Sequence, residues 1–332
     1  MIGQEWTALL PLALSASAFP LAYLATRKME GLLKGRGMQV PDVHKEGEPL
    51  VARPGGPAIL LAMATAMVAI GMASGDIRPL SVAAVASVAG LVGLIDDLRT
   101  LSGPMKVALL FGASLPILLM GTYSPFPVLP FVGRLRLTII YPFLVLVAIP
   151  VTANTFNMID VYNGLLSGFS IIAAIPFILA FALTGDWAMA GTALAFSLAV
   201  AGFYPFHRNP ARVFPGDSGS LAVGAAFGAM AIVGHMEVVG VVALIPAVLN
   251  SFFVLSSVRG FMEHRNMKKR PVRLRADWKI EAVKDEDAPM TLSRMLLAGG
   301  PLTEEDLVKS VYLLEAYSAA LALVTLGLTW WS

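Results

Sequence analysis

The segment LSVAAVASVAGLVGLID, residues 80–96, decides the fold, because it carries no charge before Asp96. An apolar helix of about 17 to 25 residues is long enough to cross a bilayer. Similar blocks recur along the 332 residues, of which 57% are hydrophobic and only 14% are charged. Soluble domains carry roughly 25% charged residues. The sequence therefore predicts an all-α integral membrane protein.

Apolar blocks of this kind predict about ten transmembrane helices. They cover residues 7–25, 56–74, 80–96, 105–121, 137–153, 164–184, 187–204, 218–234, 237–258 and 308–331. The stretch before Leu9 contains Glu5 and no Lys or Arg, whereas a signal peptide begins with basic residues. We therefore expect a retained first span. Because ten spans return the chain to its starting side, the N- and C-termini are both expected outside.

The Lys and Arg residues test this topology independently. In it, 21 of the 24 lie in or beside five loops on one side, and only Arg78, Arg134 and Arg136 fall on the other. The positive-inside rule predicts such an asymmetry for cytoplasmic loops. We expect one polytopic domain, 1–332, in the cell membrane. Its cytoplasmic loops would be residues 27–55, 97–106, 154–163, 205–217 and 259–307.

The last of these loops has a pattern of its own. Apolar and charged side chains alternate over residues 272–282 around Ala276-Asp277, which predicts a small cytoplasmic β-hairpin. The run Thr303-Glu304-Glu305-Asp306 is typical of a capped helix start. There is no Cys, so neither a disulfide nor a thiolate metal site is expected.

Two adjacent carboxylates, Asp96 and Asp97, close the third span. Acids at a helix end can simply face water, but the C-terminus of a helix disfavours anions. Two acids there need a compensating cation. A metal ion or Lys106, nine residues further on, would supply it.

An amide or acid side chain recurs every third residue after the fifth span, at Asn154, Asn157, Asp160 and Asn163. On a helical turn these residues fall on one face. Polar caps at a helix end would account for one or two of them. Four in a loop without Lys or Arg favour a ligand that needs amide donors and acceptors.

Two further polar stretches lie on the same predicted side. Asp217 follows a tight turn and opens the eighth span. Such an acid is more often an N-cap than a metal ligand, although one carboxylate can serve both for a hard cation such as Mg²⁺. The basic stretch 263–271 contains His264 and Arg265. It is typical of a juxtamembrane cluster on anionic lipid, and it would equally hold a pyrophosphate.

These motifs, in this order, resemble the polyprenyl-phosphate N-acetylhexosamine-1-phosphate transferase family. The resemblance runs from about Asp42 to the last helix, and is carried by GLIDDLRTLSGPMKVALLFGASLPIL (93–118), by 214–250 and by His264-Arg265. It is greatest for the UDP-GlcNAc–dolichyl-phosphate GlcNAc-1-phosphate transferase branch, with an archaeal member expected. The bacterial phospho-MurNAc-pentapeptide translocase has three consecutive histidines in the loop of His264, which this sequence lacks. The bacterial Asp-Gly-x-Asp-Gly pattern is only partly matched at 160–163.

The resemblance implies a reaction. N-acetylglucosamine 1-phosphate would pass from UDP-GlcNAc to a polyprenyl (dolichyl) phosphate at the cytoplasmic face, releasing UMP, as the first step of lipid-linked oligosaccharide synthesis for protein glycosylation. It also implies Mg²⁺ dependence, with Mn²⁺ left open as a substitute. The partners would be the two substrates and membrane lipids, with no nucleic acid and with a homodimer left open.

The resemblance also assigns roles. It makes Asp96, Asp97 and Lys106 catalytic, and gives Mg²⁺ to Asp217 and Asn157. The nucleotide sugar would be bound by Asn163, Asp160, Asn154, His264 and Arg265. The lipid phosphate would be bound by Lys45 and Lys106, with Asp42, His44 and Lys45 matching a polar motif of the family's first loop.

The implied reaction joins two anions, so Mg²⁺ and Lys or Arg must offset their repulsion. A phosphate monoester, with a second pKa of about 6, is mostly ionised at neutral pH. We therefore expect the acidic pair to position Lys106, Mg²⁺ or the lipid phosphate rather than to act as a base. The alternatives are a UDP-MurNAc-pentapeptide-type translocase, a nucleotide-sugar transporter and a non-catalytic membrane scaffold. Transporters place charges near the bilayer midplane, which ranks that alternative lower.

Overall fold

The computed structural model describes residues 2–258, 270–285 and 287–330. Helices dominate it, since a helix pairs its own backbone groups inside a membrane. The helices are α1 (Ile2–Ala16), α2 (Ala18–Gly35), α3 (Gly56–Ser74), α4 (Ile77–Arg99), α5 (Gly103–Met120), α6 (Tyr141–Ile159), α7 (Leu165–Leu183), α8 (Trp187–His207), α9 (Gly216–Val233), α10 (Glu237–Ala243), α11 (Ile245–Val258), α12 (Leu292–Leu296) and α13 (Glu304–Trp330), with a short 3-10 turn at Leu297–Gly299.

Three short antiparallel hairpins decorate the ends of the bundle. They pair β1 (Gln39–Pro41) with β2 (Leu50–Ala52), β3 (Val128–Leu129) with β4 (Gly133–Arg134), and β5 (Val272–Leu274) with β6 (Ile280–Ala282). The third is the hairpin predicted from sequence, and its register pairs Val272 with Ala282 and Leu274 with Ile280. The other two were not predicted, because the sequence around them shows no alternation of apolar and charged side chains like that of residues 272–282.

Nine helices in the described part of the chain are long and apolar enough to cross a membrane, and the bent pair α10–α11 makes a tenth span when its two helices are counted as one. The predicted fold class is confirmed, and the chain is a multi-pass membrane protein. Two boundaries were wrong: the first span continues to Gly35 and α6 continues to Ile159. The last helix begins at Glu304, and Thr303 Oγ1 accepts the Asp306 N–H at 3.1 Å, which confirms the capped start predicted at 303–306. Hydropathy marks where the apolar side chains stop, but a helix continues wherever its backbone and polar side chains find partners.

A bend of 70° separates α10 from α11. Pro246 has no N–H to donate to the carbonyl of Val242, so a straight helix would leave that carbonyl unpaired. The Ser318 hydroxyl of α13 donates to it at 2.6 Å. The break is therefore held by a side chain from another helix.

Helix α9 is the centre of the bundle, with 89% of its span buried. Glycines let its backbone touch the neighbouring helices. A Cβ on Gly93 of α4 would lie 2.3 Å from the Asp217 carbonyl oxygen, and one on Gly224 would lie 2.6 Å from the Thr152 carbonyl oxygen of α6. Because these backbones meet, the side chains at the ends of α4, α6 and α9 converge.

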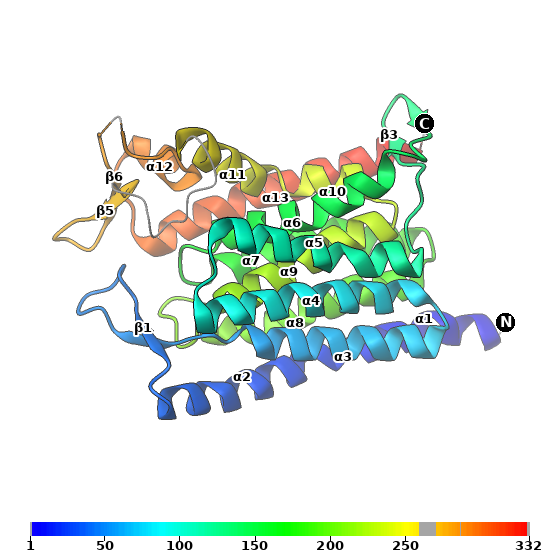
Figure 1. Ribbon diagram of the computed structural model, residues 1–332, viewed down its shortest axis with the longest axis horizontal. Coiled ribbons are helices and arrows are strands. Elements are labelled where there is room, and N and C mark those ends of the chain that lie inside the picture. The colour runs from blue at the N-terminus through cyan, green and yellow to red at the C-terminus, as the bar shows by residue number, and fades with distance from the viewer. Residues whose placement is uncertain (1, 259–269, 286, 331–332) are drawn as a thin grey trace.

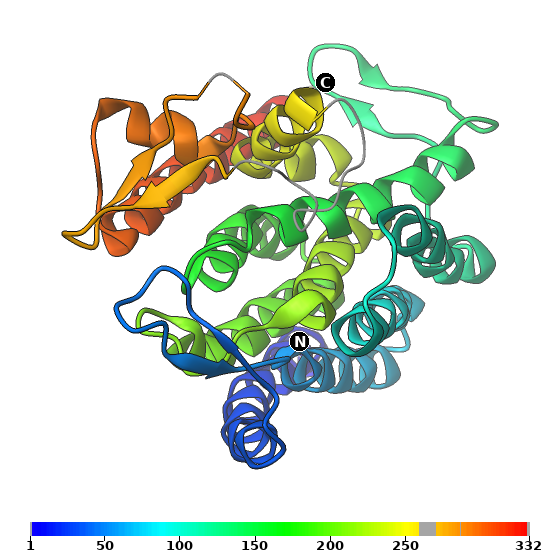
Figure 2. The same cartoon turned by 60° about the vertical axis from the view of Figure 1, so that its left-hand side comes forward.

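Both chain ends lie at one end of the bundle, the C-terminus beside β3, while β1, β5 and β6 lie at the opposite end (Figure 1). This arrangement agrees with an even number of spans. We call the end that carries β1, β5 and β6 the loop end. The view in Figure 2 shows the β3–β4 hairpin projecting from the side of the bundle.

Candidate active site

The segment 52–56 lies against the start of α9 at the loop end. The backbone of this segment runs beside 213–215: Gly55 N–H donates to the Phe214 carbonyl and Gly56 N–H to the Pro215 carbonyl, both at 2.8 Å. Further along, a Cβ on Gly56 would lie 2.1 Å from the Gly219 nitrogen. The turn before α3 is thereby pressed against the start of α9.

Asp97 caps α9 from another helix. Its Oδ1 accepts the Asp217 N–H at 3.0 Å and its Oδ2 accepts the Ser218 N–H at 2.9 Å. Both N–H groups belong to the first turn of α9, where backbone donors have no acceptor within the helix. The positive end of the helix dipole also favours an anion there. The side chain is 1% exposed. Asp97 therefore fixes where α9, and with it Asp217, begins.

Asp96 and Asp217 face each other across Lys106. The Lys106 ammonium lies 2.7 Å from Asp96 Oδ2 and also contacts Asp217 Oδ2. Asp96 Oδ1 accepts the Leu101 N–H at 2.6 Å, which tightens the turn between α4 and α5. The cation that two acids at the end of α4 require is thus supplied by the start of α5.

Arg53 is a site residue that the sequence did not reveal. Its Nη2 lies 3.1 Å from Asp97 Oδ1 and 3.0 Å from Asp217 Oδ1, so it ties the two carboxylates together. In the sequence it is one more basic residue of a basic loop. The signal was its position directly before the Pro-Gly-Gly turn that opens the second span.

These groups form the polar end of a cavity of about 480 Å³. Apolar side chains of α5, α6 and α11 make up most of the remaining wall. They include Val107, Phe111, Val147, Val151, Val254 and Leu255. Asn250 of α11 holds this wall in place, because its Nδ2 donates to the Met158 carbonyl at 3.1 Å and its Oδ1 accepts the Leu292 N–H at 3.0 Å.

The polar series after the fifth span is divided between two places. Asn154 and Asn157 line the cavity, and Asn157 Nδ2 donates to Ser220 Oγ at 2.8 Å. Asp160 instead points toward His207, with 3.7 Å between Oδ1 and Nε2. Burial raises the pKa of Asp160 to about 8, and the Arg53 charge opposes that rise.

The other predicted binding residues lie outside the cavity. Asn163 donates its Nδ2 to Asp42 at 2.8 Å, and Lys45 is ion-paired with Glu304. Asn163 does not follow Asn157 into the cavity because α6 ends at Ile159, after which a spacing of three no longer keeps side chains on one face. His264 and Arg265 lie outside the described residues.

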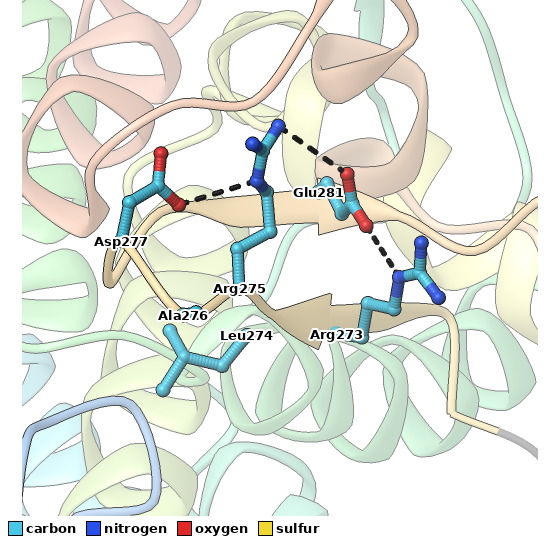
Figure 3. A pocket seen from close by; sticks show the side chains of 6 residues that line it. All are labelled: Arg273, Leu274, Arg275, Ala276, Asp277 and Glu281. Carbon is cyan, nitrogen blue, oxygen red and sulfur yellow. Dashed lines mark hydrogen bonds and ion pairs between the residues drawn. The ribbon is translucent and has the colours of Figure 1, made fainter.

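A second hollow, of about 380 Å³, lies on the β5–β6 hairpin (Figure 3). Its two arginines already have partners: Arg275 lies 3.2 Å from Asp277 and 3.8 Å from Glu281, and Arg273 is paired with Glu281. The hollow is lined by these charged residues with only Leu274 and Ala276 as apolar neighbours, and it has neither the amide side chains nor the apolar wall of the cavity. The cavity at the helix ends is the better candidate.

The structure thus combines a bundle of membrane-spanning helices with a charged cavity at its loop end, an arrangement that suits a membrane-embedded enzyme. The model of glycosyl transferase family 4 matches residues 79–235. A phospho-N-acetylmuramoyl-pentapeptide-transferase of Shouchella clausii is 30% identical over 282 residues, 78% of this chain and 84% of that protein. The chain therefore belongs to glycosyl transferase family 4 and is a sugar-phosphate transferase.

Archaeal relatives extend over more of the chain. A Sulfolobus acidocaldarius protein, provisionally named UDP-N-acetylglucosamine–dolichyl-phosphate N-acetylglucosaminephosphotransferase, is 26% identical over 315 residues, covering 92% of this chain and 93% of its own length. A protein of Saccharolobus solfataricus with the same provisional name is 26% identical over 323 residues, 95% of this chain and 96% of that protein. The family resemblance seen in the sequence, and its tendency toward this branch, are confirmed.

Proposed function

We propose that the protein transfers N-acetylglucosamine 1-phosphate from UDP-GlcNAc to a polyprenyl phosphate of the dolichyl type. The reaction takes place at the cytoplasmic membrane face, releases UMP and begins the synthesis of lipid-linked oligosaccharide for glycosylation. The cavity carries this proposal, because Arg53 and Lys106 lie at one end of it and an apolar wall makes up the rest. A phosphate on a hydrocarbon chain needs both. The names of the archaeal relatives support the same donor and acceptor.

The chemistry requires a lipid phosphate oxygen to attack the β-phosphorus of the donor while UMP departs. Both reactants are anions, so the site must offset their repulsion. Arg53 and Lys106 do this, and the carboxylates of Asp97 and Asp96 hold them in place before substrate arrives. Cations fixed in advance stabilise developing charge without reorganising during the reaction.

Mg²⁺ fits the donors of this cavity. Asp217 offers a carboxylate and Asn157 an amide oxygen, both hard ligands of the kind Mg²⁺ prefers. Over the described residues no three His, Cys, Asp or Glu side chains already form a metal group, since Lys106 and Arg53 stand between the carboxylates. We infer that Asp217 and Asn157 would hold Mg²⁺, with Asp217 exchanging a contact to Arg53 or Lys106 for the metal; Mn²⁺ is left open as a substitute. When bound, the metal would neutralise phosphate charge.

The apolar wall has a role of its own in this proposal. Val107 and Phe111 of α5 face the same cavity as Val254 and Leu255 of α11. Burying hydrocarbon against such side chains stabilises binding by roughly 25 cal/mol for each Å² removed from water. The first isoprene units of the acceptor therefore lie along this wall, with the phosphate at the polar end.

UDP-MurNAc-pentapeptide is the second candidate donor, because the Shouchella clausii relative of that activity is 30% identical to this chain. Both donors carry the same uridine diphosphate, so the cavity's cations suit either. The difference lies in the sugar substituents, which the assay below can vary.

Release of UMP by the purified protein tests the proposal. We expect release with UDP-GlcNAc, a polyprenyl phosphate and Mg²⁺, and none when the lipid is omitted, when the metal is chelated, or in the Asp217→Ala variant. UMP release with UDP-MurNAc-pentapeptide but not with UDP-GlcNAc would show that the former is the donor. Folded protein that releases no UMP from any UDP-sugar, yet imports one into proteoliposomes, would contradict the proposal and favour transport.

A further inference from the structure

Four polar residues from three distant segments form a buried cluster at the loop end, which we call the clasp: Asp42, Lys45, Asn163 and Glu304. Glu304, Asn163 and Asp42 are at most 5% exposed. The segments are the first loop, the stretch between α6 and α7, and the first residue of α13. No sequence motif suggested that these three segments meet.

Each member of the clasp has a defined partner. Glu304 Oε1 accepts the backbone N–H of Asn163 at 2.7 Å, and Glu304 Oε2 is ion-paired with Lys45. Asn163 Nδ2 donates to Asp42 Oδ2 at 2.8 Å. Asp42 Oδ1 accepts the N–H of His44 at 3.3 Å, which closes the turn of the first loop. One glutamate thus joins the first loop and the α6–α7 stretch to α13.

The clasp fixes the stretch that follows the cavity's amide residues. Only residues 160–164 separate α6 from α7, and Asn157 lies three residues before them. Helix α13 makes a second hydrogen bond to this stretch, in which the Tyr312 hydroxyl donates to the Gly164 carbonyl at 2.6 Å. With both bonds in place, the end of α6 cannot shift relative to α13 without breaking buried hydrogen bonds.

Lys45 is committed to this cluster rather than to the cavity. It is absent from the cavity wall, and its side chain is 20% exposed while that of Glu304 is 5% exposed. Removing one partner of a buried ion pair leaves an uncompensated charge and is strongly destabilising. A lipid phosphate that captured Lys45 would have to leave the Glu304 carboxylate in that state.

We propose that Lys45 and Glu304 are positioning residues, which act on the donor side of the site by fixing the end of α6 and do not bind the lipid phosphate. This inference rests on the proposed function. It assigns Lys45 a different role from the one that the family resemblance implied.

Kinetics of three proteins test the inference: the wild type, Lys45→Met, and Lys45→Met combined with Glu304→Gln. Lys45→Met leaves the buried Glu304 carboxylate without its cation and so loosens the end of α6. We expect the KM for UDP-GlcNAc to rise about tenfold, which is the size of coupling seen between residues in contact. The double variant removes both charges and keeps an acceptor for Asn163. We expect its KM to return to within about threefold of the wild type. The KM for the polyprenyl phosphate should stay unchanged in both.

A surface pair on α13 supplies the control. Glu305 and Lys309 are ion-paired with side chains 60% and 63% exposed, so neutralising both should leave either KM unchanged. A raised lipid KM in Lys45→Met that Glu304→Gln fails to restore would overturn the inference. If Lys45→Met does not fold, the double variant is compared with the wild type instead, and a raised KM for the polyprenyl phosphate in it would overturn the inference. An inactive wild type would instead refute the proposed function, before any variant is compared.

Discussion

Asp97 uses both carboxylate oxygens on the backbone of α9, one for Asp217 N–H and one for Ser218 N–H. A proton taken up by either oxygen would weaken the cap, because the cap depends on the negative charge of the carboxylate. Asp96, by contrast, accepts one backbone N–H and gives its other oxygen to Lys106. Two neighbouring acids therefore have different tasks, one of which fixes a helix start and the other a cation.

This difference predicts that Asp97→Asn is more damaging to stability than Asp96→Asn. An asparagine at 97 has one acceptor oxygen and would turn an NH₂ toward a buried N–H, at a cost of about 1–3 kcal/mol. At 96 an asparagine still accepts the Leu101 N–H, and Lys106, which loses its ion pair with Asp96, keeps the one with Asp217. Thermal midpoints in detergent measure the stability of the two variants. An equal fall in midpoint for both would argue against the capping of α9 by Asp97. We also expect that high pH does not restore the activity of either variant.

Asp160 gives the fold a pH dependence. Burial raises its pKa to about 8 from 3.8, against the opposing charge of Arg53 and with a further rise from Asp217 and Asp97. Between about pH 4 and about pH 8 the unfolded chain has lost this proton and the folded protein retains it. Stability therefore falls as pH rises through that range and levels off above it.

The Asp160→Asn variant should lack this component. In EDTA and detergent, we expect the thermal midpoint of the wild type to fall more between pH 5 and pH 8 than that of the variant. Parallel curves for the two proteins would show that Asp160 is ionised in the folded state throughout the range.

The sequence predicts Asp96, Asp97, Lys106 and Asp217 on the same side of the membrane. Each lies at a helix end, and the distribution of Lys and Arg assigns these helix ends to one side. The prediction missed Arg53, since an arginine in a basic loop has an ordinary explanation as a positive-inside charge. It also expected Asn163 beside Asn157. The series leaves the helix at Ile159, and beyond a helix end the spacing of residues no longer fixes their direction.

At the scale of elements, the site depends on how closely α4 and α9 approach. Gly93 lies against the backbone of Asp217 and Ser218, where a Cβ would be 2.3 to 2.6 Å from three main-chain atoms. Backbone cannot move aside as a flexible side chain can. The close approach of two helices thus sets the position of the carboxylates.

Gly93→Ala should therefore push the start of α9 away and abolish most UMP release. Gly112→Ala is the matched control, because a Cβ there meets nothing within 4 Å. We expect Gly112→Ala to keep wild-type activity. Loss of activity in both variants, or in neither, would contradict the role of the α4–α9 contact.

The elements themselves were largely readable from the sequence. Apolar length predicted ten spans, and alternation predicted the β5–β6 hairpin. The break between α10 and α11 was not predicted, since gly and pro residues are common in spans that stay straight. Pro246 is visible in the sequence, but the Ser318 hydroxyl that donates to the Val242 carbonyl at the break comes from another helix.

At the scale of the whole molecule, the charge asymmetry predicts which side the loop end faces. The chain has no Cys, so single cysteines report their side without a background. A membrane-impermeant maleimide added to intact cells should label Val132→Cys, which is 66% exposed near the β3–β4 hairpin. It should label Ala276→Cys of the β5–β6 turn only after permeabilisation. The reverse pattern would invert the topology and place the cavity outside.

The central claim is that a sugar phosphate, and not a sugar alone, moves to the lipid. UDP-GlcNAc labelled with ³²P at the β-phosphorus tests it directly. Our account predicts that the label enters the organic phase with the polyprenyl lipid while unlabelled UMP stays in water. Label that remains in the aqueous phase as UDP, with the sugar on the lipid, would contradict it.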